Sequence, residues 1–221
     1  MSCKIKSYSF YAQDSCHNAR VYLRYNDMMN TAIIIKKPYP YQNKVALIDH
    51  KKRRFNGIVM SKKILIEGSI IQYTLERKGT VDILHNVEYL AIPLQWGKQD
   101  LLFLHHILEI CYFFIPPEST IDGVFEFLFF LLHSEQLSWT LTLQKLFLCK
   151  LFLLLGMYPQ TVFFKTNIMK KLLYISIKDV IQLEVDNHEQ PLMDQWLQQC
   201  ILNHQKEFSF KTMAFLERTG T

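Results

Sequence analysis

The chain of 221 residues is 49% hydrophobic, 14% aromatic and 20% charged, a composition that predicts a folded protein with a sizeable core and excludes intrinsic disorder. Its formal charge of +5 is unevenly divided, because residues 1–95 contain 15 Lys and Arg against 7 Asp and Glu, whereas residues 96–221 contain 10 against 13. A basic half joined to a mildly acidic half is typical of a protein of which one part contacts a polyanion.

The cysteines favour a reducing compartment. Their number is odd and no CxxC pair occurs, so the sequence predicts neither a disulfide framework nor a zinc site. The N-terminal residues have no apolar run of signal-peptide length, so we expect a cytoplasmic protein. The five cysteines are Cys3, Cys16, Cys111, Cys149 and Cys200.

Residues 1–94 are expected to form a β domain. Short runs rich in Ile, Val and Tyr alternate with turn residues, which is typical of strands joined by tight connections. Several short antiparallel strands in fewer than 100 residues indicate a small barrel or sandwich, and a five-stranded oligonucleotide-binding (OB) barrel is one economical closure. The expected strands cover residues 21–25, 32–37, 44–49, 69–75 and 80–92.

Residues 95–221 are expected to form a helical domain. Ser119 and Asp122 resemble a capping box at the start of the second of its helices. The third is apolar on nearly all sides and should lie at the centre of a bundle, since Lys145 and Lys150 interrupt it too early for a membrane span. Residues 160–186 fit both strand alternation and helical spacing, so the sequence does not decide between a strand and a helix there. The expected helices cover 99–115, 121–132, 138–155 and a segment from about 191. The predicted fold class is thus α+β, an N-terminal OB-fold-like β-barrel followed by an all-α domain.

The sequence contains no recognisable catalytic motif. It has no GxSxG nucleophile turn and no glycine-rich loop that would hold a phosphate. The adjacent His105 and His106 point to different sides of a helix, unlike a metal-binding pair. We therefore expect no enzyme, no cofactor and no metal, and the hypothesis of a hydrolase or transferase has no feature in its favour.

The strongest functional signal is a cluster of nine basic residues within 28 positions of the β half, with aromatic residues among them. Barrels of this kind hold phosphates with lysine and arginine side chains and stack bases on the aromatic rings between them. The segment HKKRRFNG (50–57) is expected to be a loop between strands. A solvated turn, an address signal or an ordinary packed loop are the competing interpretations. The candidate DNA-binding residues are Lys36, Lys37, Lys44, Lys51, Lys52, Arg53, Arg54, Lys62, Lys63, Tyr39, Tyr41 and Phe55.

The order of basic barrel and apolar helices resembles the bacterial RecO family of recombination mediator proteins. The resemblance rests mainly on LQKLFLCKLFLLLGMYPQ (143–160), LLFLHHILEICYFFIPPE (101–118), VFEFLFFLL (124–132) and EGSIIQYTLERKGTVDILHNVEYL (67–90), and more faintly on CILNHQKEFSFKTMAFLER (200–218). The chain departs from the family in two respects. It lacks the four-cysteine zinc site that many relatives carry, and it has no clear copy of their basic loop.

The resemblance implies a non-enzymatic protein of the bacterial nucleoid that binds single- and double-stranded DNA, promotes annealing and helps load recombinase. Its implied partners are a RecR-like protein and the acidic C-terminal tail of single-stranded-DNA-binding protein. The alternatives are an adaptor that keeps the fold without DNA binding, and a membrane-associated helical protein. Cations that could receive such a tail are Lys145, Lys150, Lys165, Lys170 and Lys171.

Overall fold

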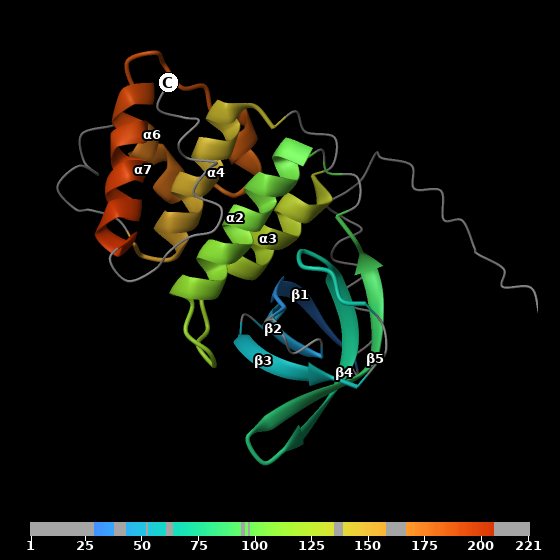
Figure 1. The fold of residues 1–221 in the computed structure, drawn as a ribbon. Coiled ribbons are helices and arrows are strands. Elements are labelled where there is room, and N and C mark those ends of the chain that lie inside the picture. Colours follow the sequence, from blue (N-terminus) through green and yellow to red (C-terminus); the bar gives the residue numbers. More distant parts are fainter. Residues whose placement is uncertain are drawn as a thin grey trace, which may run out of the picture.

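Five strands form a closed barrel, and a group of helices packs against one side of it (Figure 1). The computed structural model describes residues 29–37, 43–51, 53–60, 64–93, 96, 98–134, 139–157 and 167–205. The strands are β1 (Asn30–Lys36), β2 (Lys44–Asp49), β3 (Arg54–Val59), β4 (Ile70–Lys78) and β5 (Val81–Ala91).

The barrel has an OB-like strand order, β1-β2-β3-β5-β4, closed by pairing of β4 with β1. The β3–β5 pair is parallel and the other four pairs are antiparallel. Side chains alternate between two environments along the strands. In β1, Ile34 points into the barrel core, whereas Ile33 and Ile35 belong to the core shared with the helices. The expected α+β architecture, a barrel followed by helices, is confirmed.

The helices are α2 (Lys98–Phe114), α3 (Val124–His133), α4 (Leu141–Leu154), α6 (Asn167–Tyr174), the 3-10 helix η1 (Lys178–Gln182) and α7 (Gln190–Gln205). They are arranged around α4, which contacts each of the others. Thr140 caps the N-terminus of α4 by accepting a hydrogen bond from the backbone N–H of Leu143. Gly156 follows its C-terminus with φ of 69°, as expected for the glycine that ends a helix.

One apolar core joins the barrel to the helices. Ile33, Ile48 and Ile70 on the outer side of the barrel pack in the same cluster as Leu104 and Phe147 of the helices. The boundary predicted at residues 94/95 lies between the end of β5 and the start of α2. The two parts are thus consecutive in the chain but share their packing.

Strand β3 was not anticipated from the sequence pattern, which favoured a loop at 50–57. Asn56 and Gly57 are in the strand because Gly57 lies against Leu84 of β5, and a Cβ at this position would lie 2.1 Å from Leu84 Cδ1. Here the glycine permits close packing instead of a turn.

Two further expectations are resolved by the helical part. Helix α3 begins after Gly123, whose φ is 81°, so the expected start with Ser119 and Asp122 as a capping box is wrong. The open segment 160–186 contains α6 and η1 within its described residues. The expected strand at 21–25 lies outside the described residues. No described helix is both long and apolar enough to cross a membrane.

Candidate nucleic-acid interface

The candidate basic residues that the structure describes lie at two ends of the barrel. Strands β2 and β3 form a hairpin in which Lys44 pairs with Ile58 at one end and Ile48 pairs with Arg54 at the other. Six residues of strand separate these ends by about 20 Å. Lys36 pairs with Ala46, near the Lys44 end, whereas Lys51 lies in the turn at the Arg54 end. The described members of the sequence cluster are therefore divided in space.

Glu67 organises the end that carries Lys36 and Lys37. Its carboxylate lies 3.5 Å from Lys36 Nζ and accepts a hydrogen bond of 2.8 Å from the backbone N–H of Lys37. His105 Nδ1 of α2 lies 3.7 Å from its other oxygen. Burial by itself raises the pKa of Glu67, but His105, the Lys37 N–H and Lys36 together bring this pKa below its ordinary value. Lys36 is thus partly neutralised, while Lys44 at the same end is exposed.

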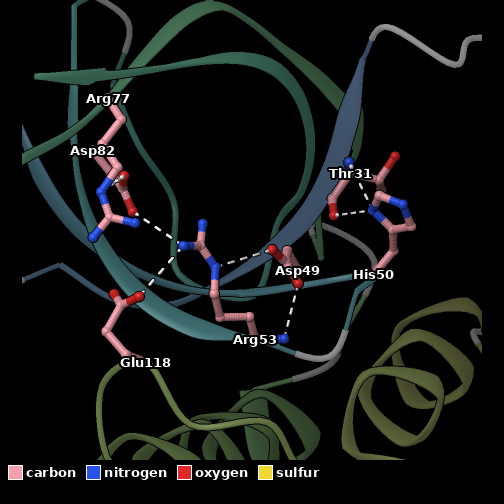
Figure 2. Close-up of polar contacts among 7 residues, drawn as sticks. All are labelled: Thr31, Asp49, His50, Arg53, Arg77, Asp82 and Glu118. Atoms are coloured by element: carbon pink, nitrogen blue, oxygen red, sulfur yellow. Dashed lines mark hydrogen bonds and ion pairs between the residues drawn. The ribbon is translucent and has the colours of Figure 1, made fainter.

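Arg53 lies among three carboxylates at the other end (Figure 2). Its Nε is 3.6 Å from Asp49 Oδ2, and its Nη1 is 3.5 Å from Asp82 Oδ2 and 3.4 Å from Glu118 Oε2. Asp82 also lies 3.8 Å from Arg77 Nε. These contacts join the β2–β3 turn, the β4–β5 hairpin and the α2–α3 connection. Arg53 therefore holds three segments together in addition to offering a positive charge.

Arg54 and Phe55 are not available to a nucleic acid in this structure. Arg54 is 5% exposed, and its guanidinium lies 5.0 Å from the centre of the Tyr112 ring of α2. Burial lowers the pKa of Arg54, opposed by the nearby Tyr112. Phe55 is fully buried inside the barrel, with its ring centre 6.2 Å from that of Tyr73. The expectation that Phe55 stacks bases is corrected, because period-two alternation in β3 turns this ring inward.

The exposed candidates among the described residues are Lys44 and Lys51. Lys37 is half-buried. The remaining candidates, Lys52, Lys62, Lys63, Tyr39 and Tyr41, lie outside the described residues.

Two of the five lysines considered for an acidic peptide are buried in the helical core. Lys145 Nζ lies 2.6 Å from Asp194 Oδ1 of α7. Lys150 Nζ donates to the carbonyl oxygens of Leu172 and Ile175, at 2.7 and 2.8 Å, and burial lowers its pKa. Neither ammonium is presented to a ligand. Lys170 and Lys171 are exposed on α6, and Lys165 lies outside the described residues.

The carboxylates that surround Arg53 were not predicted from the sequence. Asp49 lies four positions before Arg53, close enough for local spacing to indicate the pair, and Asp49 Oδ1 also accepts the backbone N–H of Arg53 at 2.9 Å. Asp82 and Glu118 lie 29 and 65 positions away from Arg53, and no spacing in the sequence predicts that they contact it. Barrel closure and helix docking bring them to Arg53.

The described residues contain no group of three His, Cys, Asp or Glu side chains placed to hold a metal ion. His106 is buried and His105 is 39% exposed, in agreement with the expectation that the two face different sides of α2.

In the comparisons with known proteins, no family model matches the chain and no curated protein matches it.

Proposed function

We propose that this protein binds DNA through its barrel without catalysing a reaction, and that it acts as a recombination mediator that anneals strands and helps load recombinase. The observation that carries the proposal is the OB-like order of the barrel within the half of the chain that has a net charge of +8. OB barrels bind oligonucleotides along their β2–β3 face and the adjoining loops. The resemblance to RecO supplies the recombination role.

The ammonium groups of Lys44 and Lys51 are the described side chains best placed to meet phosphates. Both are exposed, and they lie at opposite ends of the β2–β3 hairpin. A single strand running along the hairpin from one lysine to the other would cover about 20 Å. Binding of this kind depends on charge and on counterion release, so it is sensitive to salt and nearly indifferent to sequence.

A second candidate, a protein-interaction adaptor with the same fold, is favoured by a different observation. Lys36 and Arg53 contact carboxylates, and Arg54 is buried. These candidate cations thus have partners within the protein, which reduces the continuous positive surface that a DNA-binding barrel needs.

Fluorescence anisotropy with a labelled single-stranded oligonucleotide over a salt series tests the proposal. Replacing Lys44 and Lys51 together by glutamate should weaken binding and reduce the slope of log K against log salt by about two. The matched control replaces Lys170 and Lys171 of α6 by glutamate, which changes the net charge by the same amount on the helical side. The control variant should keep the wild-type slope.

This assay distinguishes the two candidate functions. Salt-dependent binding that only the Lys44 and Lys51 variant loses supports DNA binding by the barrel. Equal losses in both double variants would contradict the assignment to the barrel. No binding by the wild-type protein at low salt would favour the adaptor. Strand annealing by the wild-type protein and not by the barrel variant would extend the result to the mediator role.

A further inference from the structure

The three carboxylates around Arg53 are not equivalent. The side chains of Asp49 and Asp82 are 6% and 4% exposed, whereas that of Glu118 is 53% exposed. Asp49 is additionally held by the backbone N–H of Arg53, and Asp82 by Arg77. Glu118 contacts the cluster through Arg53 Nη1 at 3.4 Å. Glu118 is therefore the partner of Arg53 that solvent or a ligand can replace.

The position of Glu118 is set by its backbone. Its N–H donates to the carbonyl oxygen of Arg54 at 2.7 Å, and the N–H of Arg54 donates to the carbonyl oxygen of Ser119 at 3.0 Å. An isolated antiparallel bridge joins Arg53 to Thr120 in the same connection. Glu118 has a φ of 64°, a conformation that side chains other than Gly, Asn and Asp rarely adopt. The α2–α3 connection is thus fixed to β3 by main-chain bonds that do not depend on the Glu118 carboxylate.

A phosphate group suits the place that this carboxylate occupies. Carboxylate and phosphate oxygens both accept hydrogen bonds from the guanidinium, which prefers the same geometry for both. The buried carboxylates of Asp49 and Asp82 balance the positive charges of Arg53 and Arg77. Glu118 therefore adds one negative charge to a group that is otherwise neutral. A phosphodiester also carries one negative charge, so in contact with Arg53 it would take the place of the Glu118 carboxylate, whose exposed side chain would turn to solvent.

We propose that Glu118 occupies the position of a nucleic-acid phosphate beside Arg53, and that DNA binds there by displacing this carboxylate. The inference rests on the proposed DNA binding and names one contact within it. It also accounts for Arg53 having both a structural and a binding role. The two buried aspartates keep Arg53 in place, while the exposed glutamate yields to the ligand.

The test is the affinity of a Glu118→Gln variant for a labelled single-stranded oligonucleotide at low salt. Loss of a competing surface carboxylate should raise the affinity about two- to five-fold, the range that exposed ion pairs allow. Wild type and variant make the same contact between Arg53 and the phosphate, so the slope of log K against log salt should be the same for both. Glu88→Gln is the matched control, since Glu88 is exposed on β5 and makes the same change in net charge.

The outcomes distinguish this inference from the proposed function. A higher affinity for Glu118→Gln that Glu88→Gln lacks supports displacement at Arg53. Equal affinities for wild type and both variants, with binding still dependent on salt, overturn displacement and keep DNA binding. Equal increases in affinity for both variants would show that the change in net charge is responsible, and would also overturn displacement. Absence of binding in all three proteins overturns both proposals. An unchanged thermal midpoint for Glu118→Gln confirms that the α2–α3 connection stays in place.

Discussion

Replacing Arg53 by glutamine should destabilise the protein far more than replacing its neighbour Lys51. Arg53 contacts the carboxylates of Asp49 and Asp82, which are almost fully buried, and its guanidinium lies 4.4 Å from the centre of the Phe55 ring. Glutamine removes the positive charge and leaves these two nearly buried carboxylates without it. Lys51 is exposed in the same turn, so the glutamine variant at this position is the matched control.

The magnitude follows from burial and distance. Charges about 3.5 Å apart attract by roughly 5 kcal/mol at an effective dielectric constant near 20, and desolvation of both ions offsets most of this. Breaking a fully buried pair by removing one partner costs about 3–5 kcal/mol. The side chain of Arg53 is 22% exposed and Asp82 retains Arg77, which lowers the expected cost of Arg53→Gln. We expect a loss of about 2–3 kcal/mol, against less than about 0.5 kcal/mol for Lys51→Gln.

Urea unfolding at neutral pH, followed by tryptophan fluorescence and by circular dichroism, measures both variants. Coincidence of the two probes checks that the transition is two-state, and equal m values allow the midpoints to be converted to free energies. A loss for Arg53→Gln no larger than that for Lys51→Gln would refute the reasoning. Arg53 would then be a surface cation whose contacts with the aspartates contribute nothing measurable.

Two predictions address the barrel and the helices. Gly57→Ala should cost about 1–3 kcal/mol in urea unfolding, because the new Cβ would overlap the buried Leu84 side chain; a neutral result would mean that β3 and β5 separate easily. Burial lowers the pKa of His106 from 6.5 to about 4, with Glu109 opposing, so the unfolded chain binds its proton more tightly. Stability from His106 is therefore complete above pH 6.5 and is lost as the pH falls to about 4, by up to ~1.4 kcal/mol per pH unit. His106→Leu should flatten the pH dependence of the urea midpoint in this range, and an unchanged profile would contradict the assignment.

Most of the secondary-structure elements could be predicted from short stretches of the chain. Short runs rich in Ile, Val and Tyr predicted β1, β2, β4 and β5 within a few residues, because strands with apolar surroundings on both faces, such as β1 and β2, leave continuous apolar runs in the chain. The all-round apolar surface of the third predicted helix placed α4 at the centre of the bundle, where the structure has it. Short stretches of the sequence therefore carry enough information to predict these elements and their burial.

Strand β3 shows where local signals fail. Its residues Asn56 and Gly57 belong to types that favour loops and turns. They form a strand because β2 and β5 pair with them on either side and because Gly57 leaves room for Leu84. Pairing with β5 joins segments about 25 positions apart, so no short window of sequence contains it.

Which basic residues are presented to a partner could be learned from the folded chain alone. The sequence predicted a basic barrel, but Lys51, Arg53 and Arg54 are neighbours with three different environments: one exposed, one among carboxylates and one buried. The carboxylate of Glu118 reaches Arg53 from 65 positions away, through the docking of the α2–α3 connection on β3. Charge is a property of the residue, whereas the accessibility of that charge depends on long-range packing, which composition and spacing do not record.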